Sequence, residues 1–441
     1  MVVENRVDEI TAGRENNLRG SMLTKLSDSL GVNRVVLALS VARLGDAIGN
    51  SILFIVIPLF VAQLPSPWFP FPDTVRIGFL IAVYGIVNAL LQPVMGALSD
   101  HFGRRKLFIQ MGLFLMGGAT LAFILAGHFA DLLILRTVQG IGVALTIPAS
   151  MALMAIATQK RSRGGSMGVY STMRMVGFAI GPLLGGLLYE QYGFDAAFIV
   201  GSTFILLGII LVQMWVNEVK PPGRQQSDRP KFKIFDLNLL HKGILGTGFA
   251  TFVMAADFSM ISDLENQFNA RLNQTAVAFG IAFSALIASR LIFQIPLGRL
   301  SDKIGRRPLL IAGLILMTPA TLLLGYVNST MQFTGLRVVQ GVASAAIAAP
   351  AFALAADLSK KGGEGRQMSI VTMGFGLGIA AGPLITGILA VQSFTLPFLI
   401  LAILTLVGLF VVYRYVPETI QPKGREQNYA SSAQSQTSDG D

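Results

Sequence analysis

Long apolar segments alternate with short polar connections along most of the chain. A transmembrane helix needs roughly 20 mainly apolar residues. Twelve segments of at least that length occur, at residues 34–62, 76–99, 107–128, 131–157, 166–190, 195–217, 243–266, 275–299, 308–328, 332–357, 367–392 and 394–416. Because backbone groups in lipid must be hydrogen-bonded within the protein, the pattern predicts an all-α integral membrane protein with twelve transmembrane helices.

Three short sequences occur twice, in the same order and at nearly the same spacing. Residues 96–105 (GALSDHFGRR) are matched by residues 298–307 (GRLSDKIGRR), an offset of 202 residues. The RxxQG sequence that begins at Arg136 returns at Arg337, and the Gly-Pro pair at 181 returns at 382, each with an offset of 201. The repeats predict two pseudo-symmetric halves of six helices, an arrangement in which transporters place the substrate path between the halves.

The polar stretches mark the expected domain boundaries. Residues 34–217 and 243–416 form the two halves, and the basic, proline-containing stretch 218–242 links them. Residues 1–33 form a polar N-terminal segment, and the Ser- and Gln-rich tail 417–441 is expected to be disordered.

Composition and charge placement agree with a membrane protein. Apolar residues make up 53% of the chain and charged residues 13%. If the N-terminus is cytoplasmic, 27 of the 34 Lys and Arg residues fall on the cytoplasmic side or at cytoplasmic helix ends, and only Arg76 and Arg271 lie on the outer side. This bias predicts a multi-pass protein of the inner (plasma) membrane with both termini in the cytoplasm. It also explains the net charge of +10 without a nucleic-acid partner.

The sequence lacks the motifs of the common catalytic sites. It contains no phosphate-binding loop with a Walker lysine, no HExxH and no nucleophile elbow. The three histidines, His101, His128 and His241, do not stand at metal-ligand spacing, and there is no cysteine. We therefore expect no enzyme activity, no cofactor and no metal.

The repeated motifs resemble those of the major facilitator superfamily, and the resemblance covers residues 34–416. It implies that the two arginine-rich stretches form the inner gate, and the residues with this expected role are Gly96, Asp100, Gly103, Arg104, Arg105, Gly298, Asp302, Gly305 and Arg306. Glycine after a helix end permits a sharp turn, and cations there meet the negative end of the helix dipole. Charge that only sets topology would explain the arginines but neither Asp100 nor the glycines.

The fifth apolar segment carries a glycine-proline motif. The motif is similar to the one that marks the antiporter branch, the twelve-helix drug:proton exporters, and its residues are Gly177, Gly181, Pro182, Gly185 and Gly186. Glycines spaced by four residues share one helix face and let a neighbouring backbone approach closely. Tight packing alone is the alternative interpretation.

Ionisable residues inside the membrane are costly and often functional. Asp46 lies near the middle of the first segment, and a buried carboxylate there can load and release protons. The family resemblance implies that Arg136 assists this proton transfer. The alternative for Asp46 is a static pair with Arg43, three residues back on the same helix face.

Asp257 is a second midplane carboxylate, in the seventh segment. The sequence leaves open whether it carries a proton or contacts a cationic substrate, and the latter would make lipophilic cations substrates. Phe54, Tyr84, Phe178 and Phe258 are the aromatic candidates for the substrate cavity.

Other charges have no assigned role. Arg174 and Arg290 are also intramembrane, with neutralisation of a carboxylate as their simplest role, and Asp263 and Glu265 are expected to be solvated near the outer mouth.

The chain is therefore expected to be a monomeric secondary transporter in the lipid bilayer, which exports amphipathic or drug-like small molecules in exchange for protons by alternating access. The alternatives are a metabolite or sugar exporter and an uncoupled facilitator of the same fold. A membrane receptor is the remote alternative, and it would need a sensory domain that the sequence does not show.

Overall fold

The first half of the protein is a bundle of long helices. The structure is a computed structural model that describes residues 33–158, 163–218, 242–358 and 364–420. The first-half helices are α2 (Arg34–Val61), α3 (Asp73–Phe102), α4 (Arg105–Ala122), α5 (Phe129–Ala157) and α6 (Arg163–Trp215), with the short helix η1 (Phe123–Leu125) after α4.

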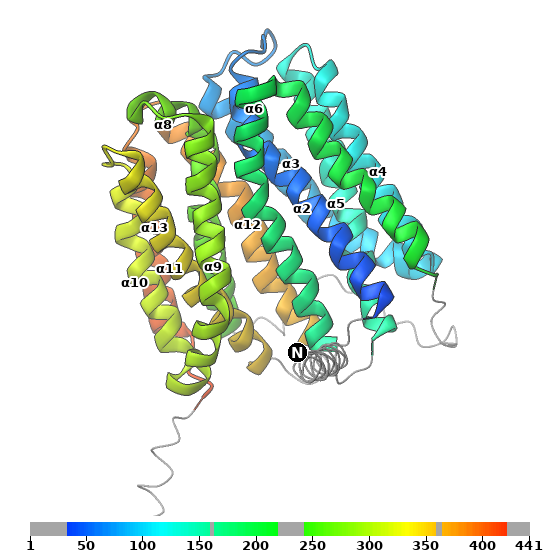
Figure 1. The fold of residues 1–441 in the computed structure, drawn as a ribbon. Helices are drawn as coiled ribbons and strands as arrows, with labels where there is room; N and C mark the ends of the chain where they lie inside the picture. Colours follow the sequence, from blue (N-terminus) through cyan, green and yellow to red (C-terminus); the bar gives the residue numbers. More distant parts are fainter. Residues whose placement is uncertain (1–32, 159–162, 219–241, 359–363, 421–441) are drawn as a thin grey trace, which may run out of the picture.

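The second half repeats this order. Its helices are α7 (Lys242–Ser259) with its continuations η4 (Met260–Asp263) and α8 (Glu265–Leu272), α9 (Ala276–Ile304), α10 (Arg306–Leu324), α11 (Thr330–Asp357), α12 (Glu364–Ala390) and α13 (Leu396–Tyr415). Figure 1 shows the two bundles beside each other, with α6 of one next to α9 of the other.

Helix α6 accounts for two of the twelve transmembrane helices. It runs for 53 residues, which at 1.5 Å per residue is about 80 Å and far exceeds the ~30 Å of bilayer hydrocarbon. Gly193 interrupts it with φ 81° and ψ −171°, a conformation that favours glycine. Eleven helical segments in the described residues are long and apolar enough to cross a membrane. With α6 divided at Gly193, they form the twelve transmembrane helices that the sequence predicts.

Corresponding helices pack in the same way in the two halves. The most extensive packing joins α2 to α6, and its counterpart joins α7 to α12. Two further pairs, α3 with α12 and α6 with α9, connect one half to the other. The halves therefore meet along two equivalent seams.

The two ends of the bundle differ. We call the end that carries Gly103 and Gly305 the signature end, and the opposite end the far end. At the far end, Asn266 Nδ2 donates to the Pro58 carbonyl oxygen at 3.1 Å, and the Val277 N–H donates to Glu190 Oε1 at 2.8 Å. Near this end Thr74 Oγ1 also donates to the Gly387 carbonyl oxygen at 3.2 Å, so three hydrogen bonds join the halves here. The structure is therefore held closed at the far end.

Candidate functional site

The two arginine-rich loops at the signature end are built alike. Gly103 ends α3 in the left-handed conformation (φ 64°), and Gly305 ends α9 with φ 108°. The first N–H groups of the next helix then donate hydrogen bonds to a glutamate side chain. Glu218 accepts from the Arg105 N–H at 2.7 Å and the Lys106 N–H at 3.1 Å.

Glu418 caps the second loop in the same way. It accepts from the Arg306 N–H at 3.0 Å and the Arg307 N–H at 2.9 Å. A carboxylate at a helix N-terminus is stabilised by the helix dipole. This pair of caps was not among the expected site residues, although Val216-Asn-Glu218 and Val416-Pro-Glu418 repeat at an offset of 200 and could have revealed it.

The contacts of Glu418 also shift its pKa. Partial burial raises its pKa, but the backbone N–H groups of Ile420, Arg306, Arg307 and Thr419 stabilise the carboxylate, so that the net effect lowers the pKa.

The charged residues of the second signature stretch form contacts within their own half. Arg306 pairs with Asp357 at 2.6 Å and lies 3.5 Å from Asp302. Thr419 Oγ1 donates to Asp357 at 2.7 Å. In the first signature stretch, Arg104 is exposed and Arg105 is buried. The side chain of Asp100 is not among the side chains that the structure describes. A Cβ on Gly96 would meet Pro148 at 3.2 Å, and one on Gly298 would meet Ala349 at 3.7 Å, so both glycines also face their own half.

The glycines of the motif in α6 lie against other backbones. A Cβ on Gly177 would meet the Ala47 Cβ at 2.6 Å, and one on Gly185 would meet the Ile52 carbonyl oxygen at 2.8 Å, both on α2. A Cβ on Gly181 would meet the Ile48 carbonyl oxygen, also on α2, at 2.8 Å.

Gly186 faces the other half instead. A Cβ there would meet the Ala276 carbonyl oxygen of α9 at 2.8 Å. Pro182 contacts the same helix, since a Cβ on Gly280 would meet the Pro182 carbonyl oxygen at 2.5 Å. The motif thus packs α6 against α2 and against the second half at once.

Asp46 is buried inside the first half and fully engaged. Arg43 forms an ion pair with it through Nη1, and Asn50 Nδ2 donates to Asp46 Oδ1 at 2.7 Å. The Arg43 guanidinium carbon lies 5.8 Å from the centroid of the Tyr170 ring. Beside this pair is a cavity of about 10 Å³, room for about one water molecule, whose polar lining includes Thr146 and Ser150.

Arg136, the arginine that the family resemblance links to Asp46, forms its contacts elsewhere. Its Nη1 donates to Gln139 at 3.0 Å, and Gln139 donates to Thr120 at 2.8 Å. Its guanidinium carbon lies 5.4 Å from the centroid of the Tyr84 ring. No ion pair joins Arg136 to a carboxylate among the described residues.

The second half contains the same arginine chain. Arg337 Nη1 donates to Gln340 at 2.8 Å, and Gln340 donates to Thr321 at 3.0 Å. Asp257 lies close to this chain and interacts electrostatically with Arg337. Thr405 Oγ1 on α13 donates to Asp257 Oδ2 at 2.9 Å.

Asp257 is therefore enclosed within the second half, between α7 and its neighbours, and is fully buried. This position gives no support to a contact between Asp257 and a cationic substrate in the path.

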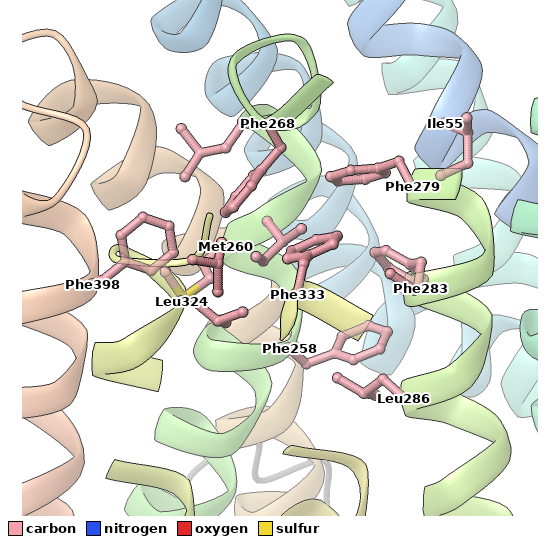
Figure 2. Close-up of a cluster of buried hydrophobic side chains, with 14 of the residues drawn as sticks. Ile55, Phe258, Met260, Phe268, Phe279, Phe283, Leu286, Leu324, Phe333 and Phe398 are labelled. Carbon is pink, nitrogen blue, oxygen red and sulfur yellow. The ribbon is translucent and has the colours of Figure 1, made fainter. Parts of the chain in front are cut away.

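Three of the four aromatic candidates come together where the halves meet. Phe54 lies 5.9 Å from Phe178 and 5.5 Å from Phe283, ring centroid to ring centroid, and Phe283 lies 5.3 Å from Phe258. We call Phe54, Phe178, Phe258 and Phe283 the aromatic barrier. Figure 2 shows Phe258 and Phe283 close together, in the same apolar cluster as Ile55 of the first half. Tyr84 lies apart from them, beside Arg136. No local pattern in the sequence distinguishes Phe283 from the other phenylalanines.

A larger cavity of about 410 Å³ lies at the far end between the halves, with Thr74, Asp263 and Asn266 in its wall. The expectation that Asp263 and Glu265 are solvated charges is wrong, because they are only 1% and 0% exposed. The continuation of α7 through η4 into α8 turns both side chains into the protein.

Two equivalent six-helix halves, joined at one end around buried polar groups, define a membrane transporter. Residues 39–262 and 244–435 match the model of the Major Facilitator Superfamily. The chain belongs to this superfamily.

Several named proteins are similar to the chain. The multi-drug resistance efflux pump PmrA of Streptococcus pneumoniae is 27% identical over 313 residues, which cover 70% of this chain and 77% of PmrA. The multidrug resistance protein MdtG of Serratia proteamaculans is 26% identical over 277 residues, which cover 61% of this chain and 66% of MdtG.

Among solved structures, a bacterial homologue of the human lysosomal transporter Spinster, in an inward-facing and occupied conformation, matches with a TM-score of 0.71. It is 16% identical, and the match covers 86% of this chain and 95% of that one. The relatives thus place the chain among transporters that resemble drug:proton antiporters.

Proposed function

We propose that the protein exports amphipathic, drug-like small molecules in exchange for protons, with Asp46 as the proton-carrying residue. The observation that carries the proposal is the cavity with room for one water beside the buried Asp46, because a water there can pass a proton to the carboxylate, which a static pair with Arg43 does not require. The similarity to proteins named multidrug efflux pumps supports the export of drug-like compounds.

The chemistry follows from the pair. Arg43 stabilises the ionised carboxylate, and a proton on Asp46 removes half of the pair and leaves the arginine uncompensated. Proton binding therefore changes the packing at the centre of the first half, which is the kind of two-state element that a transport cycle needs. In this proposal Arg43 is the cation that tunes Asp46, whereas Arg136 positions Tyr84 and α4 through Gln139.

The orientation is part of the proposal. With the signature end in the cytoplasm, the linker and both termini are cytoplasmic, as the distribution of Lys and Arg favours. The structure, closed at the far end, then corresponds to an inward-facing state. The capped loops with Arg306 and Asp302 would form the inner gate when the halves close there.

Transport into proteoliposomes tests the coupling. A panel of amphipathic compounds is offered to vesicles with an acidic lumen, with the membrane potential clamped by potassium and valinomycin and with protein-free liposomes as the control. Protons leaving the lumen should drive the accumulation of some compounds above the external concentration. Asp46→Asn should abolish this accumulation and spare energy-independent counterflow, whereas the matched control Asp195→Asn, at an exposed position of α6, should change neither.

Equal loss of accumulation and counterflow in a folded Asp46→Asn protein would contradict the proton-carrying role. If transport by the unaltered protein does not depend on the pH gradient, the result would favour an uncoupled facilitator.

A further inference from the structure

Two arginines lie at the same level on the seam between α6 and α9. The register of this seam is fixed by close contacts. A Cβ on Gly186 would meet Ala276 of α9, and a Cβ on Gly280 would meet the Pro182 carbonyl oxygen. As the helices are antiparallel, moving roughly two to four turns from these contacts toward the signature end brings Arg174 to within about a turn of Arg290.

Their electrostatics agree with this register, because Arg174 acts on Arg290 as a like charge. Two cations held near each other inside a membrane repel and are costly unless an anion lies close to both.

Neither arginine has such an anion. Among the described residues, no hydrogen bond and no ion pair is formed by either guanidinium, and both side chains are partly buried. Asp46 acts on Arg174 electrostatically, but its ion pair is with Arg43, and Asp257 is enclosed near Arg337. Neither Arg174 nor Arg290 therefore forms an ion pair of its own with a described carboxylate.

Aromatic rings flank both guanidinium groups. The Arg174 guanidinium carbon lies 5.8 Å from the ring centroid of Phe178, a member of the aromatic barrier, and that of Arg290 lies 5.9 Å from the ring centroid of Phe375 on α12. The Phe178 ring packs against Phe54, and Phe54 packs against Phe283. These rings lie on the far-end side of the two arginines. The pair of charges thus lies directly on the signature-end side of an apolar surface.

The duplication does not account for these arginines. The repeat offsets of 201 and 202 residues put Phe375 at the position equivalent to Arg174 and Asn88 at the position equivalent to Arg290. The opposite seam, between α3 and α12, therefore carries an amide and a ring where this seam carries two positive charges. The charges are a property of one side of the path and not of the fold's symmetry.

We propose that Arg174 and Arg290 together bind the anionic group of an amphipathic organic anion, whose apolar body packs against the aromatic barrier. Guanidinium groups form strong, charge-assisted hydrogen bonds with carboxylates and related oxyanions. An apolar wall with a few convergent polar groups is the usual form of a small-molecule site. The inference rests on the proposed export function and names the substrate class of its central path.

A binding measurement tests this inference without a proton gradient. Purified protein in phosphatidylcholine nanodiscs is titrated with dansyl-labelled undecanoate and with its methyl ester, which lacks the charge but keeps the apolar body. The carboxylate should bind at least about tenfold more tightly than the ester, a difference that one charge-assisted contact can supply. Equal affinities for the acid and the ester in the unaltered protein would overturn the inference, whatever any variant does.

Variants locate the effect. Arg174→Gln and Arg290→Gln should each remove most of the preference for the acid while leaving ester binding nearly unchanged, and Arg174→Lys should retain part of it. Arg271→Gln is the matched control, because Arg271 is an exposed arginine at the far end whose guanidinium lies over Phe394. An equal loss in the control, or a loss for acid and ester alike in the Gln variants, would contradict the assignment.

Two further measurements distinguish a free organic anion from a lipid headgroup, and this inference from the proposed proton exchange. Addition of phosphatidylglycerol to the nanodiscs should not weaken binding of the carboxylate, and competition by this lipid would overturn the free anion in favour of a lipid headgroup. Acid preference without any pH-driven transport would leave this inference standing and refute the proposed proton exchange. Proton-driven transport without a preference for the acid would refute this inference and leave the proposed proton exchange standing.

Discussion

Arg43 and Asp46 form an ion pair three residues apart on α2, inside the first half. Removing one partner of such a pair leaves an uncompensated buried charge, which typically costs about 3–5 kcal/mol, whereas removing both costs much less. The pair therefore makes the centre of α2 sensitive to the charge of a single carboxyl group.

This sensitivity predicts non-additive stability effects. Arg43→Gln should lower the unfolding free energy more than the double variant Arg43→Gln with Asp46→Asn does. A double-mutant cycle based on thermal unfolding in detergent measures the coupling between the two residues. Additive effects within about 0.5 kcal/mol would show that the two residues do not depend on each other.

The packing of α6 against α2 predicts a cost for any side chain on the shared face. A Cβ on Gly181 would meet Ser51 and the Ile48 carbonyl oxygen, so Gly181→Ala should destabilise the protein by about 1–3 kcal/mol. Gly168→Ala in the same helix is the matched control, because nothing lies within 4 Å of its added Cβ. Thermal unfolding of both variants measures the difference, and an equal change in the two would argue against a close α2–α6 contact.

The cap on α10 predicts a pH-dependent stability contribution. Since the pKa of Glu418 is lowered in the folded protein, its carboxylate stabilises the fold above the unfolded pKa of about 4.3, and this contribution is lost as the pH falls through the lower folded value. Glu418→Gln should therefore reduce thermal stability slightly near neutral pH, and its difference from the unaltered protein should shrink in acid. A difference that stays constant from neutral pH down to about pH 3 would rule out the titration of Glu418 as its cause.

The enclosure of Asp257 predicts that it does not select substrates by charge. Because its carboxylate accepts from Thr405 inside the second half, Asp257→Asn should change the transport of permanently charged cations and of neutral compounds to the same degree. Transport assays with tetraphenylphosphonium and an uncharged compound compare the two. If only the transport of the cation is lost, the result would support a direct contact between Asp257 and cationic substrates.

The sequence was sufficient for the fold because its strongest signals act over long stretches. Apolar length identifies each transmembrane helix, and the repeated GALSDHFGRR and GRLSDKIGRR stretches align the halves, so the twelve-helix architecture is confirmed. The apolar pattern also placed a boundary between residues 190 and 195, where Gly193 divides α6.

The partners of buried charges could not be predicted in the same way. They depend on the rotation of each helix about its axis and on the register between helices that are distant in sequence. Asp46 has Arg43 within reach on its own helix, so the sequence could offer this pair as an alternative. The opposition of Arg174 and Arg290 depends on the α6–α9 register, and the burial of Asp263 depends on the turn from α7 into η4, neither of which leaves a local pattern.

The central claim is that Asp46 exchanges a proton when substrate binds. Unbuffered, detergent-solubilised protein is mixed with the compound that accumulates most strongly in proteoliposomes, and the release of protons is followed with a pH indicator. The unaltered protein and Asp195→Asn should release protons on binding, while Asp46→Asn should bind the compound without releasing any. Undiminished proton release by Asp46→Asn would contradict the account.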